Sequence, residues 1–224
     1  MSIGFKIQKR VRTVDAATVE KFRSIAVANI SDSMMRMTHG GPRLRPLHSG
    51  GVLCGVALTV KSRPGDNLMV HAALNRAKPG DVIVVDAGGD LTNSLMGELM
   101  LAHAQQIGCA GVIIDGAVRD YGWIRSNTFP VYAAGVTHRG PYKSGPGEVN
   151  CTIAIDGMVI EPGDLIVGDD DGFVCVPFDQ TETVFAAADK KQQGEVKSMA
   201  AIKAGTVDRS WVERALADAN CEGI

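Results

Sequence analysis

Short runs of apolar and β-branched residues, bounded by turn residues, recur along the chain and predict buried strands. The longest run covers residues 51–60, and the turn at residues 79–81 leads into a second run over residues 82–90. A third run covers residues 110–115. Shorter strands are expected at residues 129–135, 150–155, 165–167 and 173–176.

Between these runs, apolar residues recur at intervals of three or four and predict helices. Each predicted helix has a capping residue at its start or a chain break at its end. In the first half of the chain they are expected at residues 14–28 (capped by Thr13 or Asp15), from Ser31 until residues 39–42 break the chain, from Asn67 to about residue 77, and at residues 94–107 before the left-handed Gly108.

The C-terminal part is predicted to be helical throughout. Asp179 begins a long helix, and Glu182 stands three residues later as the reciprocal half of a capping box. Gly205 ends that helix, and residues 207–219 form a last one. We therefore expect one compact α/β domain over residues 1–224, with a helical C-terminal arm and no linker.

Two short segments of the chain are similar to each other: residues 79–86 (PGDVIVVD) and residues 162–169 (PGDLIVGD). Both copies predict a type I or II turn that leads into a strand. Two copies are too few for a solenoid. Recurrent turn chemistry and an ancient duplication both explain this similarity.

The composition is that of an ordinary globular protein. Hydrophobic residues make up 45% of the 224 residues, charged residues 21%, and the mean hydropathy is +0.05, which excludes a disordered chain. The net charge of −2 leaves no basic excess, so neither a dedicated nucleic-acid binder nor a membrane-surface binder is expected. Without a signal peptide or an apolar run of about 18 residues, we expect a cytoplasmic protein.

The most informative stretch for chemistry is GCAGVIIDGAVRDYG at residues 108–122. It predicts a buried strand, with Arg119 and Asp120 just beyond the strand's carboxyl end. Ligands of open α/β sheets bind at that end. There the guanidinium of Arg119 could bind an oxyanion, and the carboxylate of Asp120 could bind a metal. A surface ion pair beside a turn is the alternative.

A second candidate is Gly97-Glu98-Leu99-Met100, close to the start of a predicted helix. The N–H groups at a helix N-terminus can bind an anion, and glycine lets a carboxylate approach closely. Glu98 would then lie near the same ligand. An ordinary helix that happens to begin with these residues explains the pattern equally.

Other residues give weaker signals. Neither the cysteines nor the histidines show metal-ligand spacing, and the odd number of cysteines predicts reduced thiols. A calcium site at residues 169–171, a nucleotide loop at residues 86–90 and a Schiff-base role for Lys61 are all less well supported than turns and solvated side chains. The residues concerned are Cys54, Cys109, Cys151, Cys175 and Cys221, and His39, His48, His71, His103 and His138.

Several blocks together resemble one known family. They are GELM at residues 97–100, IIDGAVRD at residues 113–120, ISDSM at residues 30–34, PGDVIVVD at residues 79–86 and EPGDLIVGDDDGFVCVP at residues 161–177. The chain resembles the 4-hydroxy-4-methyl-2-oxoglutarate / 4-carboxy-4-hydroxy-2-oxoadipate aldolases. That family includes the regulators of ribonuclease activity A and members labelled menaquinone methyltransferase. The resemblance covers about residues 15–205, and the D-G-x-x-R-D block is its most specific part.

The resemblance implies a swivelling β/β/α-type domain that assembles as a homotrimer or hexamer. It also implies a metal-dependent (class II) pyruvate aldolase acting on a small 2-oxo acid, with oxaloacetate decarboxylation as a side activity. Asp120 would hold Mg²⁺ or Mn²⁺, with water filling much of the remaining shell. Arg119 would contact the substrate oxygen at the bond that breaks.

The resemblance also assigns roles to the second block and to the arm. Backbone N–H groups of Gly97, Glu98, Leu99 and Met100 would bind the pyruvyl carboxylate. Glu98 stands where the family has an acidic residue that orients a metal-linked water, although glutamate is one methylene longer than aspartate. Glu195 is a looser match to an acidic residue that the family supplies from a neighbouring subunit.

This chemistry suits the residue types. Cleavage of a carbon–carbon bond β to a ketone leaves a pyruvate enolate, whose charge a chelated metal stabilises as a Lewis acid. A guanidinium hydrogen bond strengthens as charge develops on the departing oxygen. No lysine is needed, and loss of CO₂ from oxaloacetate gives the same enolate.

Two other functions remain open from the sequence. The family includes non-catalytic regulators that bind ribonuclease E, and the Arg-Asp pair does not distinguish these from aldolases. A methyltransferase would have to bind S-adenosylmethionine. The contacts to the far end of a 2-oxo acid also stay open, because His138, Arg139 and Lys143 on a Gly/Pro-rich loop could bind a distal carboxylate or simply be solvated.

Overall fold

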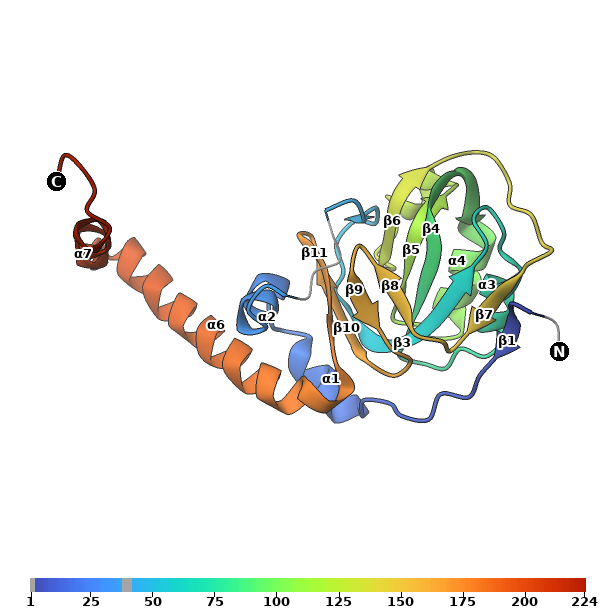
Figure 1. Cartoon of the computed structure of the whole chain (residues 1–224), viewed down its shortest axis with the longest axis horizontal. Helices are drawn as coiled ribbons and strands as arrows, with labels where there is room; N and C mark the ends of the chain where they lie inside the picture. Colours follow the sequence, from blue (N-terminus) through green and yellow to red (C-terminus); the bar gives the residue numbers. More distant parts are fainter. Residues whose placement is uncertain (1–2, 38–41) are drawn as a thin grey trace.

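The computed structural model describes residues 3–37 and 42–224; the predicted chain break at residues 39–42 and His39 fall largely in the segment outside it. Within the described residues, nine strands form one mixed sheet and two more form a hairpin sheet. Figure 1 shows this body and, leading away from it, a helical C-terminal arm. The predicted α/β class and the helical C-terminal arm are confirmed.

Strands and helices alternate along the chain only from β3 to β6, and the strands from β6 to β11 follow one another without a helix between them. The strands are β1 Phe5–Ile7, β2 Arg45–Pro46, β3 Leu53–Ser62, β4 Asp81–Met96, β5 Gly111–Val118, β6 Val131–Val136, β7 Gly147–Val149, β8 Ile153–Ile155, β9 Met158–Ile160, β10 Leu165–Asp169 and β11 Gly172–Val176. The helices are α1 Ala16–Phe22, α2 Val27–Ser33, α3 Leu68–Leu74, α4 Glu98–Gln106, α5 Tyr121–Ile124, α6 Thr181–Lys203 and α7 Ser210–Asp218, with a 3₁₀ turn at Phe178–Gln180.

The centre of the sheet is parallel. The strands β3, β4, β5 and β6 lie side by side in this order, and α3, α4 and α5 connect each strand to the next. On the other side of β3, β7 and β10 pair antiparallel with different parts of the strand. The carboxyl ends of β4 and β5 therefore lie next to each other at one edge of the body.

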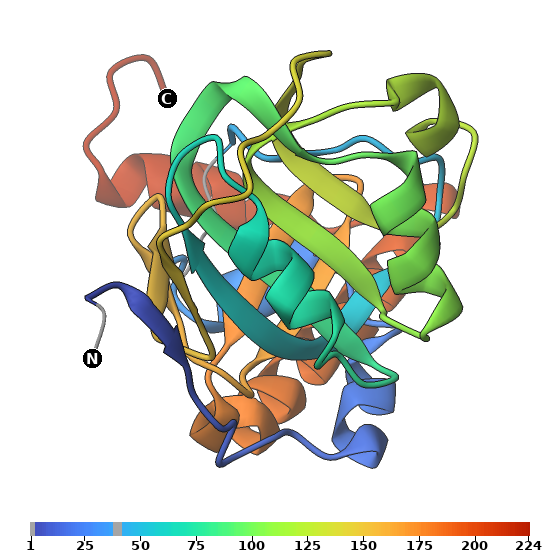
Figure 2. The same cartoon turned by 90° about the vertical axis from the view of Figure 1, so that its right-hand side faces the viewer.

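Three apolar cores stack in α–β–β–α order. Alternate residues of β4 point to opposite faces, so Ile83 and Val85 pack under α3 and α4, whereas Val82 and Val84 face the strands β8–β11. A third core lies between β10–β11 and the helices α1, α2 and α6. Figure 2 shows α3 and α4 in front of the sheet and the helices α1 and α6 behind it. Burial on both faces explains the continuous apolar runs in these strands.

The predicted helix over residues 14–28 is wrong in its extent. Asp15 caps α1 as expected, since its Oδ1 accepts a hydrogen bond from the N–H of Thr18 at 3.0 Å. The helix ends at Phe22, however, and α2 begins at Val27, so Ser31 lies inside α2. Side chains distant in the sequence accept hydrogen bonds from the N–H groups at the break between α1 and α2. Gln192 Oε1 accepts from Ala26, and Asp169 Oδ2 accepts from Val27.

Other element bounds also differ from the prediction. β4 continues to Met96, because Ser94 and Met96 pair with β5, so α4 begins only at Glu98. The strand predicted at residues 150–155 begins only at Ile153, as β8. The short strands β1, β2, β7 and β9 were not predicted.

The predicted caps are right at two places and wrong at two. Gly108 (φ +83°) follows α4 in the expected left-handed conformation, and Gly205 (φ +69°) follows the end of α6, as expected. Asn67 precedes α3, but it is Asp66 Oδ1 that accepts the N–H of Leu68, at 2.9 Å. The capping box from Asp179 to Glu182 does not form, because a 3₁₀ turn precedes α6 and no side chain caps that helix.

The two PGD segments do form equivalent turns that lead into strands. Their strands, β4 and β10, pair with β3. In each turn the aspartate is buried and paired with an arginine of the N-terminal segment: Arg10 Nη1 lies 2.6 Å from Asp81, and Arg12 Nη2 lies 3.0 Å from Asp164. The segment before α1 thus ties both turns together.

Two further expectations concern membranes and thiols. Among the described residues, no helix combines the length and the apolar character that crossing a membrane requires. All five cysteines are free. Burial raises the pKa of Cys54 and Cys109 to about 11, which keeps both thiols protonated and unreactive at neutral pH.

Close packing of strand β3 gives a test of this fold. A Cβ at Gly55 would lie 2.3 Å from the carbonyl oxygen of Gly80 and 2.8 Å from Cβ of Ala110. We expect Gly55→Ala to lower the free energy of unfolding by about 3 kcal/mol, measured by urea denaturation. Gly194→Ala, in an open part of α6, is the matched control and should not lower the free energy of unfolding. Equal stabilities for Gly55→Ala and the wild type would contradict this packing.

Candidate active site

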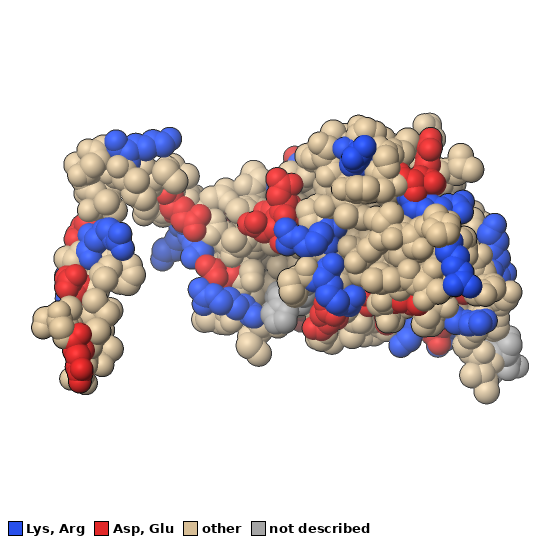
Figure 3. All heavy atoms as spheres, turned by 90° about the horizontal axis from the view of Figure 1, so that it is seen from above, with Lys and Arg blue, Asp and Glu red and all other residues tan. Residues whose placement is uncertain are grey.

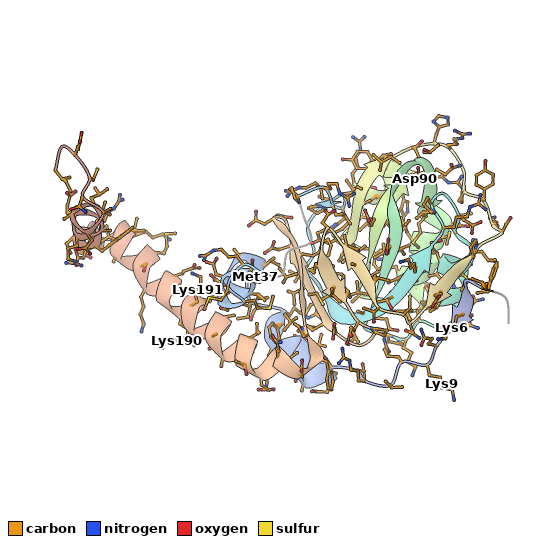
Figure 4. The ribbon with its side chains drawn as sticks, in the orientation of Figure 1. Lys6, Lys9, Met37, Asp90, Lys190 and Lys191 are labelled. Atoms are coloured by element: carbon orange, nitrogen blue, oxygen red, sulfur yellow. The ribbon has the colours of Figure 1, made fainter. Side chains whose placement is uncertain are left out.

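A cavity of about 500 Å³ lies at the carboxyl ends of β4 and β5. Its wall consists of residues 94–100, Arg119 and Asp120, loop residues 140, 141 and 143, and Asn67 and His71 of the α3 region. Figure 4 labels Asp90, which lies in the second half of β4 near the top of the sheet in that view. The structure therefore brings both sequence candidates, residues 97–100 and the Arg-Asp pair, into one wall.

Asp120 is held in an unusual backbone conformation. It directly follows Arg119 at the end of β5, and its φ of +59° and ψ of +41° are left-handed. The N–H of Arg119 donates to the carbonyl oxygen of Met96 at 2.9 Å, which joins the ends of β5 and β4. Non-glycine residues in this region are uncommon and cluster at functional sites.

Gly97 allows the Asp120 carboxylate to approach the start of α4. Asp120 Oδ2 accepts a hydrogen bond from the N–H of Glu98 at 2.9 Å. A Cβ at Gly97 would lie 2.4 Å from that oxygen and 2.8 Å from Cγ of Arg119. The φ of Gly97 is −143°, which any residue can adopt, so lack of space is what requires glycine here.

Arg119 and Asp120 form a loose ion pair. Nε of Arg119 lies 3.7 Å from Asp120 Oδ2, beyond hydrogen-bonding distance, and both side chains are a little less than half exposed. The guanidinium is therefore free to bind an anion. The Asp120 carboxylate has one oxygen on the Glu98 N–H and can still offer the other to a ligand.

The N–H groups of residues 97–100 are only partly free. That of Glu98 is used by Asp120, and that of Met100 donates to the carbonyl oxygen of Gly97 at 3.1 Å. Within residues 3–37 and 42–224, those of Gly97 and Leu99 have no acceptor. The side chains of Glu98 and Leu99 are exposed.

Two cavity residues could not be found from sequence. Asn67 is buried, and its Nδ2 donates to the carbonyl oxygen of Leu95 at 2.9 Å. His71 lies one turn further along α3 on the same face. The pKa of His71 is lowered, first by partial burial and then by the positive charge of Lys143. Nothing in the sequence indicates that a histidine within a predicted helix lines a cavity.

The three loop residues left open by the sequence, His138, Arg139 and Lys143, are placed differently from one another. Lys143 lines the cavity. His138 lies in a shallower hollow beside it, together with Arg119 and Asp120. Arg139 lines neither hollow, and its carbonyl oxygen accepts hydrogen bonds from the N–H and Oγ of Ser94.

Glu195 is not at this site within one chain. It lies on α6, where its Oε2 accepts a hydrogen bond from Nδ2 of Asn29 at 2.8 Å. Figure 1 shows α6 on the far side of the body from α4. If Glu195 has a role at the cavity, a second copy of the chain must supply it.

Asp115, the first aspartate of the D-G-x-x-R-D block, forms an ion pair and does not line the cavity. Its carboxylate is buried and accepts a hydrogen bond from Nη2 of Arg43 at 2.8 Å; the same nitrogen lies 2.6 Å from Asp156. Burial raises the pKa of Asp115, and Arg43 opposes that shift. Only the last two residues of the block, Arg119 and Asp120, face the cavity.

The described residues contain no group of three His, Cys, Asp or Glu side chains suited to holding a metal. A cation at this site would be bound by the Asp120 carboxylate and chiefly by water. That donor set fits Mg²⁺, which dehydrates reluctantly and is often held by one or two carboxylates. The less favoured candidates remain unsupported: Lys61 is exposed beside Asp86, and Asp169 accepts backbone N–H groups of Val27 and Asp171.

Charge on this side of the molecule is mixed. Figure 3 looks down on the upper face of the body and shows acidic and basic side chains interspersed, without a continuous basic patch. That distribution agrees with the small net charge.

Comparison with known proteins gives a consistent family. A family model described as RraA-like (Aldolase/RraA) matches residues 27–175. A protein of Halalkalibacterium halodurans, named "Putative 4-hydroxy-4-methyl-2-oxoglutarate aldolase", is 41% identical over 174 residues, which are 78% of this chain and 83% of that protein.

Solved structures share the fold under different descriptions. RraAS2 of Streptomyces coelicolor, described as an unusual member of the RNase ES inhibitor RraA family, is 26% identical with a TM-score of 0.76, over 84% of this chain and 98% of that one. A Geobacillus kaustophilus protein described as S-adenosylmethionine: 2-dimethylmenaquinone methyltransferase is 29% identical with a TM-score of 0.63, over 68% and 95% of the chains.

The electrostatic link between two cavity residues can be measured. Removing the charge of Lys143 favours protonated His71, so Lys143→Ala should raise the pKa of His71, followed by NMR titration of the imidazole. Lys6→Ala is the control, because Lys6 lies on β1 away from this cavity. The arrangement of the wall is incorrect if both variants titrate like the wild type.

Proposed function

Because the chain belongs to the RraA-like (Aldolase/RraA) family, we propose that it is a divalent-metal-dependent aldolase. Its substrate would be 4-hydroxy-4-methyl-2-oxoglutarate or a related 4-hydroxy-2-oxo diacid, cleaved to pyruvate and a second 2-oxo acid. Oxaloacetate decarboxylation would be a side activity. The main support is the contact between Asp120 and the Gly97–Glu98 segment, which places a carboxylate, a free guanidinium and free N–H groups around one cavity.

The residues of the wall suit a 2-oxo diacid. The N–H groups of Gly97 and Leu99 would bind the pyruvyl carboxylate. Arg119 would donate to the oxygen on which charge develops as the carbon–carbon bond breaks, and that hydrogen bond strengthens in the transition state. Lys143, from a separate segment of the wall, would bind the distal carboxylate.

Asp120 would hold Mg²⁺ or Mn²⁺, and Glu98 would orient a water bound to the cation. When bound, the cation would supply Lewis-acid stabilisation of the negative charge on the departing pyruvate enolate. The role of Asp120 needs a carboxylate that is fixed in direction but still accessible. Its left-handed backbone and the Glu98 N–H fix the direction, and its partial exposure leaves it accessible.

We further propose that the protein acts as a homotrimer or hexamer in which Glu195 reaches the site of a neighbouring copy. The arm supports this. The distal half of α6 and α7 project from the body (Figures 1 and 4) and expose apolar side chains, namely Val196, Met199, Ile202 and Trp211. Apolar surface of this kind is typical of contacts between chains.

A non-catalytic regulator that binds ribonuclease E is the second candidate. The fold match to the Streptomyces coelicolor protein supports it. An enzyme would release pyruvate in the presence of Mg²⁺ and depend on Asp120. A regulator would inhibit the nuclease stoichiometrically, without regard to the metal or to Asp120.

Pyruvate release tests the aldolase. We expect pyruvate from 4-hydroxy-4-methyl-2-oxoglutarate and from oxaloacetate with Mg²⁺, measured by coupling to lactate dehydrogenase, and loss of both with EDTA. Asp120→Ala and Gly97→Ala should each lower kcat/KM at least about 100-fold while the circular dichroism spectrum is unchanged. Gly122→Ala, beside Asp120 but in open space, is the control and should stay active. A folded protein with Mg²⁺ that gives no pyruvate from either compound would refute the proposal.

Subunit mixing tests Glu195. Asp120→Ala and Glu195→Gln chains should each be inactive alone, since each lacks one part of the site. Mixed by reversible denaturation, they should regain a fraction of the wild-type activity, because some sites then combine an intact Asp120 with an intact Glu195. A fully active Glu195→Gln variant, or no recovery in the mixture, would argue against a shared site.

A further inference from the structure

The loop that carries Lys143 is held by a buried carboxylate. Asp66 is completely buried, and its Oδ2 accepts the N–H groups of Ser144 at 2.7 Å and Gly145 at 2.8 Å. Its Oδ1 accepts the N–H of Leu68 at 2.9 Å. Within residues 3–37 and 42–224, Asp66 forms no ion pair with a lysine, arginine or histidine side chain. Such a group is retained only where its hydrogen bonds are complete.

The backbone beside Asp66 adds a second set of bonds to the same loop. The N–H of Asn67 donates to the carbonyl oxygen of Tyr142 at 3.0 Å, and the N–H of Tyr142 donates to that of Gly65 at 2.8 Å. Lys143 therefore lies between two residues, Tyr142 and Ser144, that are both bonded to the Asp66 turn. Its backbone is fixed although its side chain reaches the cavity.

The other end of the loop is bonded to β4. Nδ2 of Asn93 donates to the carbonyl oxygen of Gly140 at 2.5 Å, and Ser94 donates twice to that of Arg139. The loop is thus attached at both ends to elements that line the cavity, and the Asp66 carboxylate supplies the two attachments next to Lys143. A loop charge of this kind is preorganised, whereas a solvated lysine on a free loop is not.

We propose that Asp66 is a positioning residue that places the Lys143 ammonium in the cavity and so sets the affinity for 2-oxo acids with a distal carboxylate. This inference rests on the proposed function for its substrate, but not for its geometry. It predicts that loss of the Asp66 carboxylate acts on the site through Lys143. The chemistry at Arg119 and Asp120 should be spared.

The first experiment uses the pKa of His71 to report the position of the Lys143 ammonium, and it needs no substrate. The pKa of His71 is lowered partly by Lys143, so it should rise in Asp66→Asn toward the value of Lys143→Ala. In the double variant Asp66→Asn/Lys143→Ala it should rise no further. Asp81→Asn is the matched control: Asp81 is also buried and accepts a backbone N–H, from Lys78, but lies at the other end of β4. It should leave the pKa of His71 unchanged.

The second experiment reads specificity. Asp66→Asn should raise KM for 4-hydroxy-4-methyl-2-oxoglutarate about tenfold with little change in kcat, and leave KM for 4-hydroxy-2-oxopentanoate, which lacks the distal carboxylate, nearly unchanged. In the Lys143→Ala background the substitution should have no added effect. If Asp66→Asn does not fold, Asn93→Ala loosens the same loop from its other end and should give the same two results.

The outcomes are separable. If the pKa of His71 responds to Lys143→Ala but not to Asp66→Asn or Asn93→Ala, the inference is wrong whatever the enzyme does. It is equally wrong if Asp66→Asn changes KM for both substrates alike. If the His71 results hold while no substrate is turned over by the wild type, the proposed function fails and the placement of Lys143 by Asp66 stands.

Discussion

The parallel pairing of β4 with β5 is the constraint on which the rest of the site depends. Its ladder runs regularly from Val82 to Asp86 and then irregularly to Met96, opposite Val118. The N–H of Arg119 extends it by one more bond to Met96. Because both strands end there, Gly97 directly follows β4 and Asp120 is the second residue after β5, so the two segments meet at the sheet edge.

The four-layer packing keeps this pairing rigid. β4 and β5 are buried on both faces, by α3 and α4 on one side and by the β8–β11 strands on the other. The buried carboxylates outside the cavity serve the same end. Asp81 and Asp164 hold the N-terminal segment, and Asp115 holds the residues before β2. Strain at Asp120 is sustainable because so much of the surrounding backbone is already determined.

The sequence predicted what depends on neighbours in the chain. The central strands, the Asp15 cap, the left-handed Gly108 and the helix end at Gly205 are set by local chemistry, and they were found. β4 was cut short in the prediction because residues 90–96 lack an apolar run, and only pairing with β5 makes them a strand. The cap of α3 was misassigned for a similar reason. The side chain of Asn67 donates a hydrogen bond to the carbonyl oxygen of Leu95, a contact set by the tertiary fold, and Asp66 accepts the N–H of Leu68 instead.

The same distinction holds for the site. Residues 97–100 and the Arg-Asp pair were found because strand ends and helix starts are visible in a sequence, and Glu98 was expected near the same ligand. His71 and Asn67 were missed because nothing local distinguishes a cavity-facing helix residue from any other. Lys143 stayed ambiguous because its surroundings are set by Asp66, 77 residues earlier in the chain.

The wall of the cavity has two origins. One part comes from adjacent strand ends and cannot be altered without disturbing the sheet. The other, residues 139–145, is a surface loop attached through a few hydrogen bonds. A scaffold built in this way can exchange the loop and accept a new substrate tail while its reacting groups keep their places. One fold carrying several different descriptions among its relatives is what such a division of the wall would produce over evolutionary time.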